Sequence, residues 1–108
     1  MTVSLEDFAK MDIRVGKVVK AEKVASSRKL VKLLVDIGEN EPRQIVAGIA
    51  EYIPPESIVG KKVVVLANLE PKKFMGVESR GMLLAADVNG RPVPLTVEED
   101  VPPGTRVR

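Results

Sequence analysis

The sequence predicts an all-β fold: a five-stranded barrel with a short N-terminal helix and a C-terminal extension. Apolar residues recur in short segments of strand length, and turns rich in glycine, proline and asparagine separate these segments. The connections are too short for the crossover helices that parallel strands require. With 108 residues, the chain has room for one domain with one core.

The N-terminal segment predicts a helix followed by a long strand. Ser4 is a suitable N-cap for a helix over residues 5–10, whose Leu5, Phe8 and Ala9 are expected to pack on the barrel. Residues 13–23 alternate as a half-buried strand does. Lys17 interrupts the apolar phase beside Gly16, which predicts a bulge or a strong bend there.

The remaining strands are expected over residues 30–37, 44–49, 62–68 and 82–88, with a short helical turn at 54–57. Five strands with a helical element between the third and the fourth match the oligonucleotide/oligosaccharide-binding (OB) barrel. The fourth strand is apolar on both faces, so its outer side should be covered.

The barrel should end near Val88, so that residues 1–88 form the helix and barrel and residues 89–108 form the extension. Asn89-Gly90 predicts a hairpin turn that leads to a sixth short segment over 92–96. The extension carries apolar residues, which either pack back on the barrel or contact a partner: Val93, Leu95, Val97 and Val101.

Composition excludes several functions. The chain has no cysteine and no histidine, so it lacks thiolate catalysis, Ser-His-Asp triads and Cys- or His-based metal sites. Nothing places Glu70, Glu78 or Asp87 in pairs at a shared site, and no phosphate-binding glycine motif is present. We therefore expect no catalytic residues, cofactor, metal or small-molecule substrate. No apolar run reaches membrane-spanning length and no secretory signal is present, which predicts a cytoplasmic protein without a membrane partner.

The net charge is only +2, but the cations are unevenly distributed. Residues 10–32 hold eight cations and two acids, and residues 61–80 hold five cations and two acids. Residues 33–60 hold five acids and one arginine. This asymmetry can create a basic face for a polyanion, although lysines also occur simply on solvated strand faces.

The most informative segment is Asn68 to Ala86, which reads N-L-E-P-K-K-F-M-G-V-E-S-R-G-M-L-L-A-A. Pro71 stiffens the loop after the fourth strand, and Gly76 and Gly81 permit conformations or close approaches that a side chain would block. Lys72, Lys73 and Arg80 make this loop basic.

This segment resembles the tRNA-binding domain found at the carboxyl end of many methionyl-tRNA synthetases and in free-standing homodimeric tRNA-binding proteins. Most of the family wording N-L-x-P-[KR]-K-[LM]-x-G-x-x-S-x-G-M-L-L-A is present in this segment. The matching residues are Asn68, Leu69, Pro71, Lys72, Lys73, Gly76, Ser79, Gly81, Met82, Leu83, Leu84 and Ala85. The resemblance extends to Asp12–Gly16, Val46–Ile49, Val59–Val63 and Glu99–Gly104, which is nearly the whole chain.

The resemblance implies a non-catalytic, structure-sensitive tRNA-binding protein of the archaeal-like free-standing type. Such a protein would be a methionyl-tRNA synthetase beta subunit or a trans-acting appendix of the enzyme. It also implies a homodimer formed through the extension and the N-terminal helix. The alternative is a peptide-binding export chaperone, because a dimeric chaperone family shares the fold but lacks the S-x-G-M-L-L-A wording.

The candidate tRNA-binding residues comprise basic residues of the two barrel loops, a strand lysine and polar or apolar residues matching family positions: Lys17, Arg28, Lys29, Asn68, Lys72, Lys73, Ser79, Arg80 and Met82. Barrels of this type use the loop between the first two strands and the loop between strands four and five as the sides of the binding groove.

Alternatives remain for five residues. Lys17 either faces the groove or is rotated outward by a bulge. Asn68 and Ser79 either contact RNA or bond nearby backbone. Met82 either contributes to binding or belongs to the core, and Phe74 either stacks on a base or plugs the barrel end.

The chain departs from common family wording at two places. Met75 stands where many relatives carry arginine before the loop glycine, so one phosphate contact should be missing. The stretch Val24–Leu30 lacks the histidine-proline pair of many bacterial relatives and is more similar to archaeal versions. Arg28 could compensate for Met75.

Overall fold

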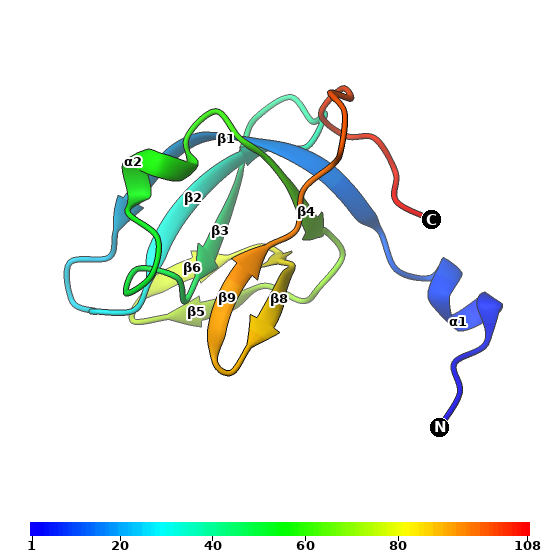
Figure 1. The fold of residues 1–108 in the computed structure, drawn as a ribbon, viewed down its shortest axis with the longest axis horizontal. Helices are drawn as coiled ribbons and strands as arrows, with labels where there is room; N and C mark the ends of the chain where they lie inside the picture. Colours follow the sequence, from blue (N-terminus) through cyan, green and yellow to red (C-terminus); the bar gives the residue numbers. More distant parts are fainter.

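The computed structural model describes residues 1–108, and its main sheet has five antiparallel strands in the order β3-β2-β1-β4-β7 (Figure 1). The elements are α1 (Leu5–Ala9), β1 (Ile13–Lys23), β2 (Val31–Asp36), β3 (Arg43–Ala47), α2 (Pro55–Ile58), β4 (Lys62–Leu66), β5 (Lys72–Phe74), β6 (Val77–Ser79), β7 (Met82–Leu83), β8 (Ala85–Val88) and β9 (Arg91–Pro94). The predicted all-β, five-stranded barrel is confirmed.

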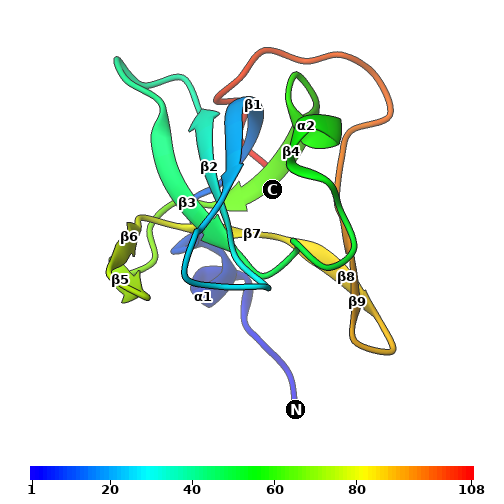
Figure 2. The same ribbon diagram turned by 90° about the vertical axis from the view of Figure 1, so that its left-hand side faces the viewer.

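Strand β1 is long enough to pair with two neighbours in succession. Its first part, Ile13–Lys17, pairs with β4, and Lys17–Lys23 pairs with β2. A strand shared in this way lets the sheet curl, and the two end strands β3 and β7 come into contact. The curled sheet is visible in Figure 2.

The predicted irregularity in β1 lies a few residues later than expected. The register with β2 shifts between Val18 and Lys20, whereas Gly16 and Lys17 remain in regular pairing with β4. Gly16 is required for packing instead, because a Cβ atom there would lie 2.5 Å from Cγ1 of Val35. Its missing side chain lets β1 pass close over β2.

The core is formed by aliphatic residues: Val18, Val31, Leu33, Val35, Ile37, Ile45, Ala47, Ile49, Ile58, Val63, Val65 and Ala67. Alternation along β2 and the inward positions of β4 supply five of these twelve residues. Helix α2 adds Ile58, its one buried residue. The aliphatic core fixes the frame on which the loops are held.

Helix α1 forms as predicted but does not pack as predicted. Ser4 Oγ accepts the Asp7 N–H at 3.0 Å, which confirms the N-cap. The expectation that Leu5, Phe8 and Ala9 pack on the barrel is wrong for a single copy of the chain. Helix α1 has no buried residue, and Leu5 is 82% exposed. The physical reason is position: α1 lies at one end of the molecule, apart from the barrel (Figure 1).

The predicted strand over 82–88 is divided at Leu84. Strand β7 pairs with β4, and Leu84 N–H still donates to Val64 O at 2.9 Å. From Ala85 onward, the chain pairs with β9 instead, through the predicted turn at Asn89-Gly90. Both turn residues have positive φ, 53° and 86°, as a type I′ turn requires.

Beyond β9, the extension wraps back around the barrel. Thr96 Oγ1 donates to Lys62 O at 2.8 Å, and Asp100 forms an ion pair with Lys62. Val15 N–H donates to Thr105 O at 2.8 Å, and Val107 N–H donates to Ile13 O at 2.8 Å. The extension thus lies along the edge of β1 that β2 leaves free.

Asp12 connects the extension with the start of β1. Its carboxylate accepts two hydrogen bonds from Arg14, both 2.9 Å, and lies 3.4 Å from Nε of Arg106. The Arg14 hydrogen bonds, followed by attraction to nearby arginines, lower the pKa of Asp12 below its ordinary value although partial burial opposes this.

Candidate nucleic-acid interface

Residues 72–80 form a two-stranded projection that we call the basic hairpin. Strands β5 and β6 pair antiparallel, with Lys72 opposite Ser79 and Phe74 opposite Val77. The turn residues Met75 and Gly76 both have positive φ, 53° and 80°. The sequence predicted an irregular loop here, because Met-Gly is not a usual hairpin signal and each strand has only three residues.

The basic hairpin presents its cations to solvent. Lys72, Lys73 and Arg80 are all exposed. Lys72 Nζ lies 5.2 Å from the centre of the Phe74 ring, a cation–π distance. Phe74 is half-buried and outside the barrel core, so it does not plug the barrel. The hairpin therefore offers lysines beside an aromatic face.

Ser79 is held inside the hairpin's attachment to the barrel. Its side chain is buried, its Oγ accepts the Val46 N–H at 2.9 Å, and its hydroxyl donates to Gly81 O at 2.9 Å. Of the two roles considered for Ser79, these contacts are the ones expected if the serine bonds nearby backbone rather than RNA.

Asn68 also uses its side chain within the protein. Its Oδ1 accepts the Asp12 N–H at 2.9 Å, and its Nδ2 donates to Lys10 O at 2.7 Å. The amide thereby fastens the segment between α1 and β1 to the end of β4. Met82, in contrast, is 43% exposed on β7 and so does not belong to the core.

The loop of residues 24–30 lies close to the basic hairpin. A depression of about 270 Å³ is lined by residues of β1, the loop, β2 and β6: Glu22, Lys23, Val24, Ala25, Lys32 and Val77. Arg28 and Lys29 are exposed on this loop. Ser27 Oγ accepts the Lys29 N–H at 3.1 Å, which helps to fix the loop's shape. The structure thus brings the loop of residues 24–30 and β6 of the basic hairpin to one depression, whose lining includes none of the predicted site cations.

Lys17 is separate from these loops. It is exposed on β1 opposite Asp36 on one side and Lys62 on the other. The β1–β2 loop begins after Lys23, so Lys17 lies about 20 Å along the strand from it. Lys17 therefore has acidic residues near it on both sides. Asp36 is its partner on β2, and Asp100 forms an ion pair with Lys62, its partner on β4.

Two cations of the sheet surface were not predicted as site residues. Lys20 is paired in register with Leu34. Lys32 is paired with Glu22, and both of these residues line the depression. Lys32 Nζ lies 2.7 Å from Glu22, and this contact lowers the pKa of the Glu22 carboxyl. The alternation of β2 could have indicated that Lys32 points out of the barrel. Local sequence could not show that the basic hairpin lies near this face, because the hairpin is distant in sequence.

Arg43 is a further residue that the sequence did not indicate. It lies on β3 among acidic residues, and its guanidinium reaches both Ala67 O and Arg80 O. These two residues flank the segment 68–79, and no local pattern could connect them with residue 43.

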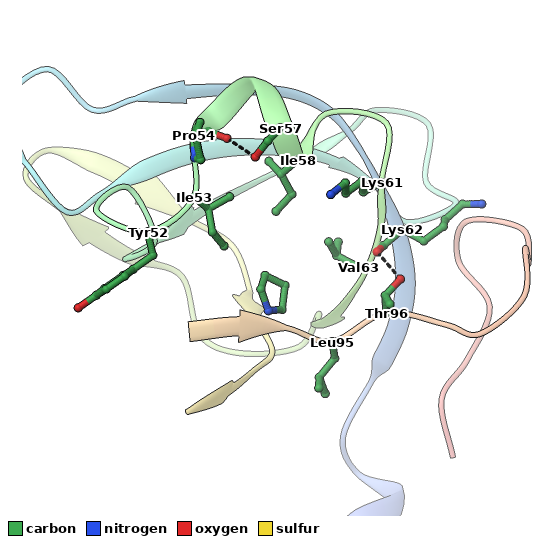
Figure 3. Close-up of a pocket in the computed structure, with 11 residues that line it drawn as sticks. Tyr52, Ile53, Pro54, Ser57, Ile58, Lys61, Lys62, Val63, Leu95 and Thr96 are labelled. Atoms are coloured by element: carbon green, nitrogen blue, oxygen red, sulfur yellow. Dashed lines mark hydrogen bonds between the residues drawn. The ribbon is translucent and has the colours of Figure 1, made fainter. Parts of the chain in front are cut away.

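A separate hollow of about 340 Å³ lies between α2, β4 and residues 94–96 (Figure 3). Its lining includes Ile53, Ile58 and Val63, with Lys61 and Lys62 near its edge. The Ser57 hydroxyl donates to Pro54 O at 2.7 Å. None of its lining residues belongs to the basic hairpin or to the loop of residues 24–30.

Comparison with known proteins shows the family. Residues 13–106 match the family described as "Putative tRNA binding domain". The chain is 65% identical over 105 residues to the methionine–tRNA ligase of Archaeoglobus fulgidus, covering 97% of this chain and 16% of that enzyme. The chain therefore belongs to the tRNA-binding domain family, and it spans about one sixth of the length of this relative.

Two solved structures extend the comparison. A MetRS-related protein from Pyrococcus horikoshii has a TM-score of 0.93 and 49% identity, covering 100% of this chain and 99% of that one. The chaperone CsaA of Bacillus anthracis has a TM-score of 0.91 and 29% identity over the full length of both chains.

Neither helix of the present structure has the length and apolar character needed to cross a bilayer.

Proposed function

We propose that this chain binds folded tRNA through the basic hairpin and the loop of residues 24–30, without catalysing a reaction. The observation that carries the proposal is the approach of these two basic segments on a barrel of the tRNA-binding domain family. Lys72, Lys73 and Arg80 on one side, and Arg28 and Lys29 on the other, are exposed cations at the required places.

The expected mode of binding is recognition of shape and charge. Lysine and arginine neutralise RNA phosphates and release counterions, which gives affinity without reading sequence. The chain has only three aromatic residues, and only Phe74 lies on the basic hairpin. Proteins that stack successive single-stranded bases use more such platforms. A structured RNA is the better ligand for this surface.

A non-catalytic role is supported by the functional groups present. The chain offers neither imidazole nor thiol for proton transfer or nucleophilic attack. Ser79, Asn68 and Ser57 use their side chains to bond backbone. We propose that its role is to raise the local concentration of tRNA and slow its release.

We further propose that the chain, a single domain over residues 1–108, serves a methionyl-tRNA synthetase in the cytoplasm as a beta subunit or trans-acting appendix. The supporting observation is the high identity to methionine–tRNA ligases together with full coverage of a MetRS-related protein.

We also propose a homodimer. The support is the apolar surface that a single chain leaves open: Leu5 and Phe8 on α1, and Val93 and Leu95 around β9, are all exposed. Two copies would present two basic hairpins, and one tRNA touching both would gain affinity from linked contacts.

The test of tRNA binding is the double variant Lys72→Ala/Lys73→Ala, measured by filter binding over a series of salt concentrations. We expect several-fold weaker binding and a salt slope shallower by about one to two units, because each phosphate contact contributes roughly 0.7–0.9. The matched control is Lys61→Ala/Arg91→Ala, which removes the same charge from exposed positions outside both segments. Equal effects of the two double variants would contradict the proposed interface.

The second candidate function is a peptide-binding chaperone, favoured by the likeness to CsaA. Labelled tRNA and an unfolded polypeptide, each titrated with the protein, distinguish the two. Tight binding of the polypeptide with no affinity for tRNA at low ionic strength would favour the chaperone.

A further inference from the structure

The basic hairpin needs support from the rest of the protein. It forms its own two-stranded sheet and is not part of the five-stranded sheet. An isolated two-stranded hairpin with three-residue strands is at best marginally stable in water. Contacts outside the hairpin must therefore fix where Lys72 and Lys73 lie.

Strand β3 provides these contacts, and it provides them to one strand of the hairpin. Gln44 Nε2 donates to Glu78 O at 2.8 Å, and Arg80 N–H donates to Gln44 O at 2.9 Å. Val46 N–H donates to Ser79 Oγ at 2.9 Å. All three bonds hold residues 78–80, and β5 with its two lysines is paired with this anchored strand.

Arg43 adds a contact that closes the base of the whole loop. Its Nη1 donates to Ala67 O, where the chain leaves β4, and to Arg80 O at 3.2 Å, where the chain returns toward β7. One guanidinium group thus joins the start and the end of the segment that carries the hairpin. A planar fork of donors suits this geometry, and a lysine could not satisfy all the same acceptors at once.

Glu39 holds the guanidinium in this orientation. It accepts from Arg43 Nε at 3.1 Å and from Nη2 at 2.6 Å, a bidentate pair. The Arg43 side chain is only 17% exposed. Because its charge is paired and four of its five N–H donors are occupied, Arg43 is poorly suited to contact phosphate directly.

We propose that Arg43, oriented by Glu39, is a positioning residue that sets the basic hairpin against the loop of residues 24–30 and thereby determines RNA affinity without touching RNA. This inference rests on the proposed function. It assigns to β3 the role of holding two groups of cations at the spacing that a folded RNA requires.

The first test is Arg43→Met, measured for tRNA affinity and salt slope. We expect tRNA binding to weaken by about three- to tenfold, which is a common effect when residues of one hydrogen-bond network are coupled. We also expect the salt dependence of binding to become shallower. The control Arg91→Met removes an equal charge from exposed β9 and should change neither quantity appreciably. A double-mutant cycle with Lys72→Ala/Lys73→Ala should show that Arg43→Met costs little once the lysines are absent.

The second test is Glu39→Gln, in which simple electrostatics and positioning predict opposite results. Removing a carboxylate near a basic surface should tighten RNA binding if charge alone matters. Positioning predicts weaker binding, because glutamine keeps only one of the two oxygen acceptors that orient the guanidinium and replaces the other with a donor. Gln44→Leu removes a different hairpin contact and should also weaken binding, which keeps the inference testable if Arg43→Met fails to fold.

The outcomes separate the inference from the proposed function. If the unmodified protein ignores tRNA at low ionic strength, the proposed function fails. If it binds tRNA through Lys72 and Lys73, but folded Arg43→Met binds equally well or the cycle is additive, only the positioning role is overturned. Tighter binding by Glu39→Gln would also overturn it.

Discussion

Ser79 is the only buried residue with a polar side chain, and it joins β3 to the turn after β6. Replacement by alanine would leave the Val46 N–H and the Gly81 carbonyl without this partner. A buried polar group that loses its partner costs about 1–3 kcal/mol. The hydroxyl is therefore expected to contribute to stability, and to RNA binding through the position of the hairpin.

We predict that Ser79→Ala lowers the free energy of unfolding by about 1–3 kcal/mol in urea denaturation. Ser57→Ala is the matched control: the Ser57 hydroxyl donates to a carbonyl in an exposed turn, and its loss should change stability by less than about 0.5 kcal/mol. Equal stability of Ser79→Ala and the unmodified protein would contradict the importance of this buried contact.

The lowered pKa of Asp12 predicts that the free energy of unfolding depends on pH. Its folded pKa is lowered, chiefly by the Arg14 hydrogen bonds, so folding favours the ionised carboxylate. The resulting stability is fully present above the ordinary carboxyl pKa, and it is lost as pH falls through the lowered folded value. Asp12→Asn should therefore be less stable than the unmodified protein at pH 7, and the difference should shrink below about pH 4.

Thermal unfolding of both proteins between pH 2 and pH 7 measures this difference. A gap in midpoint temperature that stays constant over the whole range would mean that ionisation of Asp12 contributes nothing.

At the scale of elements, two glycines mark the place where the extension crosses the β2–β3 turn. Gly104 has a φ of 92°, and a Cβ there would lie 2.7 Å from Ile37 O and 3.1 Å from the Cα of Gly38. Both conditions oppose any side chain at residue 104.

We predict that Gly104→Ala loosens the extension from β1 without unfolding the barrel. Amide hydrogen exchange should accelerate at Val15 and Val107, whose N–H groups bond across this edge. Gly60→Ala is the control, because Gly60 has a φ of 86° but a Cβ added there would meet no atom within 4 Å. Unchanged protection of Val15 and Val107 would refute the prediction.

The strands of the barrel could be predicted from sequence because their signals are local. Alternating apolar residues indicated β1 and β2 to within one residue, and Asn89-Gly90 identified the turn between β8 and β9. The basic hairpin was missed because its strands carry no apolar alternation and Met75 adopts an uncommon positive φ. The break at Leu84 was missed because it depends on which neighbour each half of the segment pairs with.

The candidate site was predictable in part for the same reason. The cations of loops 24–30 and 72–80 were visible in the charge pattern. In the structure, Val24 and Ala25 of one loop and Val77 of the other line one depression, which contains none of the predicted cations. The bonding of Asn68 and Ser79 to distant backbone was left open, because it joins residues more than 30 positions apart. The contacts of Arg43 are equally long-range.

At the scale of the whole molecule, the exposed apolar surface of α1 predicts a partner. Leu5, Phe8, Ala9 and Met11 line a hollow of about 360 Å³ together with residues 106–108 of the extension. Leu5→Asp would place a charge in this surface, which water tolerates and an apolar interface does not.

We predict that the unmodified chain sediments as a dimer and that Leu5→Asp shifts it toward the monomer. Glu6→Gln changes the neighbouring helix position outside this hollow and should leave the dimer intact. A monomer at all concentrations for the unmodified chain, or a dimer unaffected by Leu5→Asp, would contradict a role for α1 in assembly.

The extension's alignment with β1 has one more consequence. A strand whose outer N–H and C=O groups face water is a template on which other chains can add, and the first half of β1 would be such a template by itself. Residues 104–107 occupy that position from within the same molecule. We therefore expect the C-terminal segment to oppose fibrous self-association of the barrel, a hazard that grows with protein concentration.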